Sequence, residues 1–327
     1  MKRKSIKMGE IVNSDASCSF FKLHTVVFVI SFIASGLISS CSPSREPANI
    51  NSVDVGDADS SPSGIIGGTL VKANEPISKS IVAIVDTAGG NVCTGSLIAE
   101  GVVLSAAHCI GRDPKAMMII FAVNAEEVLA SADSLAGWLK NPKVRRVQSA
   151  LVSSIWIARE KALQARFIAN NRQPITLTEA ETKNTGDISV LNFSGKTPAG
   201  YAPAKFLPDA SLLKNGATVT LAGYGFTDGP KKSGTTELRE VQVQIHDVSY
   251  SQTEITLDQN HGKGACHGDS GGPAYLNVNG QEYLWGITSR GVDDINDHCS
   301  TYSAYTNALA YSETIQKSVH MFTQSGN

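Results

Sequence analysis

The chain has 327 residues, and its 28 lysines and arginines nearly balance its 30 aspartates and glutamates, for a net charge of −2. This balance argues against a nucleic-acid-binding protein, which usually carries a basic excess or stripe. Apolar residues make up 42% of the chain, too many for a disordered protein. The length predicts about two compact units, and 29 glycines favour a turn-rich β protein. Composition alone allows either a soluble enzyme or a binding module.

Residues 1–41 have the form of an export signal. Basic residues in the first 22 positions precede an uncharged apolar run at 25–40. That run is too short for a membrane-spanning helix, which needs about 20 apolar residues, and is typical of a signal peptide. Because the basic region is long, a translation start at Met8 is an alternative to Met1.

The segment Ile38-Ser39-Ser40-Cys41 resembles a bacterial lipobox. The resemblance implies a lipid on Cys41, in a periplasmic or outer-membrane lipoprotein precursor whose only membrane contact is that lipid. The alternative is an ordinary secretory signal in which Cys41 is incidental. Both interpretations predict export from a bacterial cell.

Residues 42–64 are rich in serine, proline, aspartate and asparagine, with almost no large apolar side chain. Such a segment buries too little surface to offset its ordering entropy, which predicts a flexible propeptide or linker. The folded domain is therefore expected over residues 65–327.

From Ile65 onward, short β-type runs alternate with glycine, asparagine, aspartate and proline, a pattern typical of an all-β sandwich or barrel. The predicted strands are residues 80–86, 96–99, 102–105, 118–123, 188–193, 218–223, 238–247 and 283–288. One stretch, 125–140, has apolar residues at helical spacing and predicts a helix.

Ser270 is a candidate nucleophile because glycines flank it in Gly268-Asp269-Ser270-Gly271-Gly272. Glycine lets the backbone turn tightly and approach a substrate, and successive N–H groups can bind a developing oxyanion. The fragment also fits the Gly-x-Ser-x-Gly elbow of α/β-hydrolases. The remaining alternative is a glycine-rich turn with a solvent-facing serine.

His108 and Asp187 lie at the ends of apolar runs. Small residues precede His108, so its imidazole can pack beside a nucleophile. Asp187 opens an apolar run and can orient a histidine. Taken singly, the alternatives are a structural histidine and a turn cap. The order His108, Asp187, Ser270 is that of chymotrypsin-like proteases, whereas an α/β-hydrolase runs Ser, Asp, His.

These segments resemble the trypsin/chymotrypsin family of serine proteases, in a bacterial member, over about 65–315. Residues 65–68 (IIGG) are similar to the family's mature N-terminus, 105–109 (SAAHC) to its histidine motif and 268–273 (GDSGGP) to its serine motif. The resemblance implies two perpendicular, antiparallel six-stranded β-barrels with a short C-terminal helix. The first barrel is expected at about 65–203 and the second at about 204–327.

The family's catalytic roles carry over by resemblance. Ser270 is the nucleophile and His108 its general base, while Asp187 orients His108. The N–H groups of Gly268 and Ser270 form the oxyanion hole. Ser289 supports Asp187.

The cysteines outside the leader are Cys93, Cys109, Cys266 and Cys299. Four cysteines allow three pairings, and the resemblance selects Cys93–Cys109 and Cys266–Cys299 in an oxidising compartment. A zinc site formed by the second pair and nearby histidines is the alternative; those histidines are His261, His267 and His298. That spacing matches no common zinc site, so no metal and no cofactor are expected.

Activation in this family pairs a freed isoleucine amine with the aspartate beside the nucleophile, which here means Ile65 and Asp269. The resemblance implies a zymogen cleaved after Gly64. Family members often carry Arg or Lys there, so a separate activating protease is expected instead of self-activation. The cut also separates the domain from any lipid on Cys41.

The specificity pocket is expected around Gly264, six residues before the nucleophile, and along the strand Ser289-Arg290-Gly291, with a further wall near Ser303. Trypsin-like members have aspartate at the position of Gly264, so cleavage after Lys or Arg is not expected. An open, uncharged pocket predicts apolar or aromatic specificity. Arg290 replaces the family's usual Trp. The long stretch between the catalytic His and Asp predicts an insertion that shapes the cleft rim or binds a partner.

Two functions fit these features. The first is a secreted, monomeric serine endopeptidase acting on protein or peptide substrates. The second is a catalytically silent relative used as a binding or adhesion module. Silent relatives usually lack a triad residue, and none is missing here, so the endopeptidase is the prediction.

Overall fold

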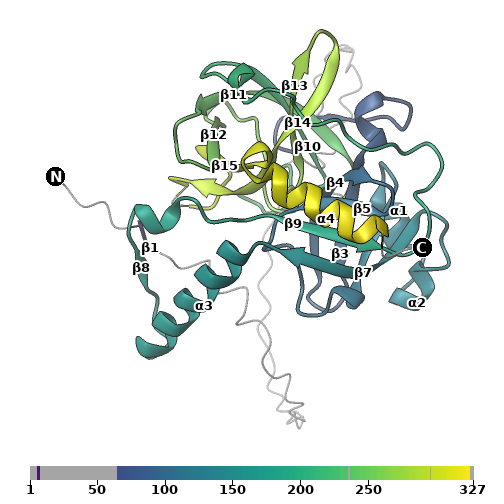
Figure 1. Cartoon of the computed structure of the whole chain (residues 1–327), viewed down its shortest axis with the longest axis horizontal. Helices are drawn as coiled ribbons and strands as arrows, with labels where there is room; N and C mark the ends of the chain where they lie inside the picture. Colours follow the sequence, from purple (N-terminus) through teal and green to yellow (C-terminus); the bar gives the residue numbers. More distant parts are fainter. Residues whose placement is uncertain (1–5, 8–64, 235, 295, 325–327) are drawn as a thin grey trace, which may run out of the picture. The chain divides into compact units, whose positions relative to one another are not determined.

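The computed structural model describes residues 6–7, 65–234, 236–294 and 296–324 (Figure 1). The predicted signal, Cys41 and the predicted linker lie outside the described residues, except for strand β1 (Ile6–Lys7), which pairs with β8 (Thr176–Leu177). No helix in these described ranges is long and apolar enough to cross a membrane.

Six antiparallel strands close a first barrel in the order β3-β4-β5-β9-β7-β6. They are β3 (Ile81–Asp86), β4 (Asn91–Ala99), β5 (Val102–Ser105), β6 (Met117–Ile120), β7 (Val144–Val152) and β9 (Ser189–Phe193). Every residue of β3, β5 and β6 is buried. Burial on both faces explains why these strands read as continuous apolar runs in the sequence.

A second sheet has the strand order β10-β13-β14-β15-β12-β11-β2, and β10 also pairs with β11, which closes a barrel of six strands. The members are β10 (Thr218–Gly223), β11 (Arg239–Asp247), β12 (Glu254–Asp258), β13 (Pro273–Val278), β14 (Gln281–Val292), β15 (Tyr302–Asn307) and the added strand β2 (Thr69–Leu70). Strand β2, from the range expected for the first barrel, therefore pairs in the sheet of the second.

The predicted all-β double barrel with a C-terminal helix is confirmed. Helix α4 (Ser312–Gln324) follows β15, and its buried Ile315 joins the core of the first barrel. Strand β2 and helix α4 thus each contact the barrel that is built mainly from the other half of the folded region. The sequence pattern did not predict strands β7, β12, β13 and β15. Each contains charged, polar or proline residues that obscure the alternation of apolar and polar side chains.

The single helix predicted at 125–140 is wrong. Two short helices, α1 (Ala125–Leu129) and α2 (Leu135–Trp138), occupy this stretch. Ser134 caps the start of α2. The Trp138 indole donates to the carbonyl of Leu129 at 3.0 Å, a contact with the last turn of α1 that requires the chain to fold back.

The longest helix among the described residues is α3 (Ser154–Ala169), which the sequence pattern did not predict. Its only buried residue is Leu163, while Ile155, Ile157 and Ile168 are about half exposed. Without one apolar face, the sequence gives no clear helical period. Helix α3 lies in the stretch where an insertion was expected.

Candidate active site

His108 and Asp187 are joined by two hydrogen bonds. His108 follows β5, Asp187 precedes β9, and these strands are paired, with Ser105 opposite Ser189. The His108 Nδ1 lies 2.7 Å from Asp187 Oδ2, and the His108 backbone N–H donates to Oδ1 at 3.0 Å. Strand pairing therefore brings together two residues 79 positions apart.

The two side chains differ in exposure and stabilise each other's charge. Asp187 is 2% exposed and His108 31% exposed. Burial alone raises the pKa of Asp187, but the charge of His108 and hydrogen bonds from His108 and Ser289 bring it below its usual value. Burial alone lowers the pKa of His108, but Asp187 raises it overall. The pair can hold the imidazole proton on Nδ1 and leave Nε2 as an acceptor.

Ser270 lies on the loop before β13, against the loop of His108. Its carbonyl accepts the N–H of Thr94 at 2.8 Å and lies 3.5 Å from the Sγ of Cys109, the residue after His108. The Ser270 hydroxyl makes no hydrogen bond with any described residue. Catalytic hydrogen bonds are often long before substrate binds. The backbone of Ser270 is thus beside His108, without a bond between their side chains.

Gly271 shows why this approach requires glycine. Its φ is +79°, and a Cβ at this position would lie 2.0 Å from the Oγ of Ser105 and 2.5 Å from the carbonyl of Thr94. Any larger residue would force the serine loop away from the end of β5.

In the loop that carries Ser270, residues 268–272, two backbone N–H groups make no hydrogen bond to a described residue. Those of Asp269, Gly271 and Gly272 donate to backbone carbonyls at 2.8–3.0 Å. Those of Gly268 and Ser270 have no acceptor among the described residues. These two groups are available to bind an oxyanion.

Asp269 is a completely buried carboxylate. The N–H groups of Gly225 and Cys266 each donate to it at 2.8 Å, and burial raises its pKa to about 7 in spite of these bonds. A Cβ at Gly223 or Gly225 would lie 2.2 or 2.5 Å from this carboxylate. The two glycines of Gly223-Tyr224-Gly225 therefore make room for Asp269.

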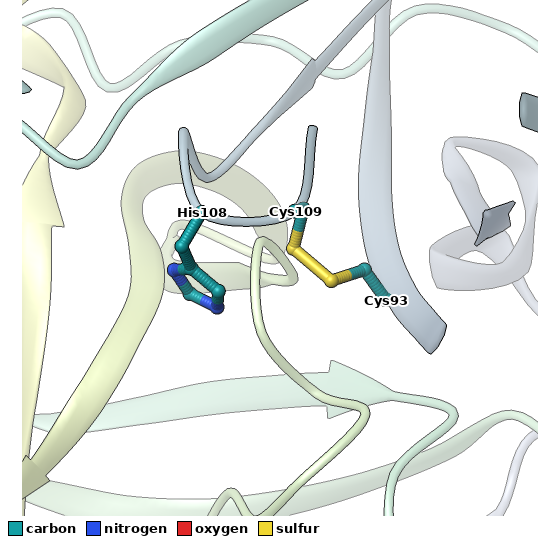
Figure 2. Close-up of side chains that lie close together, drawn as sticks. All are labelled: Cys93, His108 and Cys109. Atoms are coloured by element: carbon teal, nitrogen blue, oxygen red, sulfur yellow. A yellow bond between two sulfur atoms is a disulfide. The ribbon is translucent and has the colours of Figure 1, made fainter. Parts of the chain in front are cut away.

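Two disulfides brace the site. Cys93 and Cys109 form one, and Cys266 and Cys299 form the other. Figure 2 shows His108 and Cys109 on one loop, which the disulfide ties to Cys93. Both cysteine pairs lie beside a histidine, but sulfurs bonded to each other are not the thiolate ligands that zinc takes.

Comparison with known proteins agrees with this geometry. The profile of the family described as Trypsin matches residues 65–315. The chain belongs to the trypsin family. It is a serine endopeptidase.

Three relatives of the chain are animal proteases. A chymotrypsin of Phaedon cochleariae is 28% identical over 260 residues, 76% of this chain and 81% of the relative. CLIP domain-containing serine protease B4 of Anopheles gambiae is 24% identical, covering 78% and 70%. Chymotrypsin-like elastase family member 1 of Canis lupus familiaris is 23% identical, covering 69% and 80%. The bacterial origin implied by the lipobox stays a prediction.

Ile65 of the protease is buried in the core of the second barrel. Its φ is +48°, an outlier for a β-branched residue. The next residue, Ile66, exchanges backbone hydrogen bonds of 2.9 and 3.0 Å with Gly264, two residues before Cys266. In the uncleaved chain the Ile65 nitrogen belongs to a peptide bond.

The predicted pocket residues of the protease lie on neighbouring segments. Gly291 and Ser303 are cross-strand partners in β14 and β15. A Cβ at Gly264 would lie 2.3 Å from the buried side chain of Gln259. The Gln259 amide bonds the residue after Gly264 at 2.8 and 3.1 Å and the carbonyl of Cys299 at 3.0 Å. The sequence did not reveal this role, because a lone glutamine carries no motif.

The sequence also missed two residues, one beside His108 and one beside Arg290. Trp156, in the first turn of α3, has its ring centroid 6.2 Å from that of His108. Glu254 makes two contacts of 2.9 Å with the guanidinium of Arg290, which the sequence had assigned to substrate binding. No sequence signal pointed to either residue, because Trp156 lies in an insertion and Glu254 is far along the chain from the motifs.

Proposed function

We propose that the protease cleaves peptide bonds with a triad of Ser270, His108 and Asp187. The Ser270 hydroxyl attacks the scissile carbonyl while His108 Nε2 takes its proton and passes it to the leaving amine. Water then hydrolyses the acyl-enzyme, and the N–H groups of Gly268 and Ser270 bind the oxyanion. The 2.7 Å contact between His108 Nδ1 and the buried Asp187 carries this proposal, because it leaves Nε2 free to accept.

A fluorophosphonate probe tests this function. Protein beginning at Ile65 should gain one adduct, located on Ser270 by peptide mass spectrometry. Ser270→Ala should gain none, and Ser249→Ala, at an exposed position, should label like the parent. Folded protein without an adduct would contradict the proposal and favour a silent binding module.

Cleavage before Ile65 is proposed to activate the protease. Asp269 is buried, and its bonds come from two backbone N–H groups, so a cation would stabilise its charge. The bridge between Ile66 and Gly264 supports a position of the freed Ile65 amine near Asp269. Cleavage also relieves the positive φ of Ile65, a strain of roughly 1–3 kcal/mol. Gly64 at the cut site favours a separate activating protease.

Substrate preference is proposed to be for apolar or aromatic residues before the scissile bond. Gly264, Gly291 and Ser303 carry no charge, so nothing among them pairs with a lysine or arginine. The two disulfides support an oxidising, extracellular or periplasmic location. A lipid on Cys41 before activation remains part of this proposal.

Trp156 is proposed to bind the substrate side chain that passes beside His108. Trp156→Ala should lower kcat/KM about tenfold for peptides that carry a bulky apolar residue at the position that passes beside His108. Peptides with glycine at that position should show little change. Matched peptide pairs measure this. Ile168→Ala, in the last turn of α3 and 56% exposed, is the control. An equal loss on both peptides would contradict a specificity role.

A further inference from the structure

Arg290 and Glu254 form a buried ion pair beside the catalytic Asp187. Nη1 and Nη2 of Arg290 each lie 2.9 Å from one oxygen of Glu254, and the side chains are 20% and 0% exposed. Two parallel contacts of this kind fix the planes of both groups. A buried carboxylate of this kind requires its cation, because removing one partner leaves an uncompensated charge.

The pair reaches across β15. Arg290 of β14 lies opposite Ala304, and Glu254 of β12 lies opposite Thr306. Residues 304 and 306 are on one face of β15 because side chains alternate along a strand. Thr306 donates its hydroxyl to the Asp187 carbonyl at 2.9 Å. The ion pair and the catalytic aspartate therefore share one face of the second barrel.

Glu254 and Arg290 also hold the segment that leads into Asp187. Glu254 accepts the N–H of Asn184 at 3.0 Å, and the N–H and hydroxyl of Thr185 at 3.1 and 2.7 Å. Arg290 Nη2 donates to the carbonyl of Thr182. This segment is the return from the insertion, so the pair fixes its approach to the active site.

Arg290 determines where the Ser289 hydroxyl can point. Arg290 Nη1 lies 3.2 Å from Ser289 Oγ, and a guanidinium can only donate. The hydroxyl therefore accepts from Arg290, and its own proton is directed to Asp187 Oδ2, 2.6 Å away.

We propose that the Arg290–Glu254 pair is a positioning device that directs the Ser289 hydroxyl onto Asp187 and so holds the carboxylate for His108. The pair does not touch the reacting atoms, and its Arg290 stands where the family usually has Trp. The inference rests on the proposed triad, and it assigns to Arg290 a role behind the site in place of substrate contact.

The test compares Arg290→Met/Glu254→Gln with the parent, both beginning at Ile65. The double variant removes both charges, and the glutamine oxygen can still accept from Thr185. It should be labelled by fluorophosphonate to the same final extent, with kcat per labelled site about tenfold lower and KM unchanged. Arg290→Lys, which keeps the charge, should recover part of the loss. Lys317→Met, at an exposed ion pair of α4, is the control.

A cycle with Ser289→Ala separates positioning from general loosening. Since the pair acts through Ser289, the combined variant should be no more than about threefold worse than Ser289→Ala alone, whereas independent effects multiply. Multiplied losses would overturn the proposal. Failure of the parent itself to label would instead reject the triad.

The acid limb of kcat/KM gives a second readout. The charged groups that act on His108 are Asp187, Arg290 and Glu160, with Arg159 also near Asp187. Asp187 raises the pKa of His108 and the charge of Arg290 lowers it. Loss of positioning weakens the Asp187 contact, so the double variant should move the acid limb to lower pH, and Arg290→Lys should move it less. A shift to higher pH, the effect of losing the Arg290 charge alone, would contradict positioning at the catalytic pair.

Discussion

Replacing Asp187 with asparagine should lower kcat/KM about 10⁴-fold, the size of the tautomer effect in such triads, while the fold stays intact. The carboxylate accepts from His108 Nδ1 at 2.7 Å and from its backbone N–H at 3.0 Å. An asparagine amide can turn its N–H₂ toward Nδ1, which places the imidazole proton on Nε2. His108 then cannot accept the proton of Ser270.

The measurement is kcat/KM near pH 8 on an apolar peptide ester, per folded molecule, with ¹⁵N chemical shifts reporting the His108 tautomer. Asp209→Asn, at a surface cap of a 3₁₀ turn, should match the parent. Activity within tenfold of the parent would show that Asp187 does not orient His108.

Protein beginning at Ile65 should be about 10²–10⁴-fold more active than protein that keeps one additional residue, Gly64. Losing one partner of a buried ion pair costs about 3–5 kcal/mol, and each 1.36 kcal/mol is a factor of ten. One added residue moves the amine without removing its charge, so the comparison tests position alone. Both proteins are assayed with the same peptide. Equal activity would contradict an Ile65–Asp269 pair.

Unfolding against pH gives this prediction a readout independent of activity. In the uncleaved chain Asp269 has a pKa of about 7, against 3.8 for an ordinary aspartate. The folded chain thus holds a proton that the unfolded chain releases, so the free energy of unfolding should fall by about 4 kcal/mol between about pH 4 and 7. Urea titrations measure this fall. Asp269→Asn, and protein beginning at Ile65, should lack it.

Local sequence determined much of the fold and of the site. Strands β5 and β10 have the predicted bounds, because their apolar runs end at turn residues. His108, Asp187 and Ser270 could be predicted as a triad because each lies in a short motif with a distinct chemical requirement. The glycines around them are required by contacts as close as 2.0 Å.

Prediction from the sequence pattern failed where contacts between residues distant in the chain decide the structure. The pattern at 125–140 is helical, but the contact of Trp138 with Leu129 divides it. Helix α3 buries only one side chain, Leu163, so its sequence has no apolar face from which a helical period could be recognised. Strand β12 begins with Glu254, which reads as a polar break until its partner Arg290 is known.

By itself, then, the sequence determined the family, the double barrel and the candidate triad, since motif and periodicity are properties of neighbouring residues. Tertiary structure alone decided that Arg290 faces Glu254 across β15, that Trp156 lies beside His108 and that Gln259 supports Gly264. These contacts depend on strand register and on how an insertion returns to the barrel. The near-neutral net charge of the chain gave no indication of the buried Arg290–Glu254 pair behind the candidate active site.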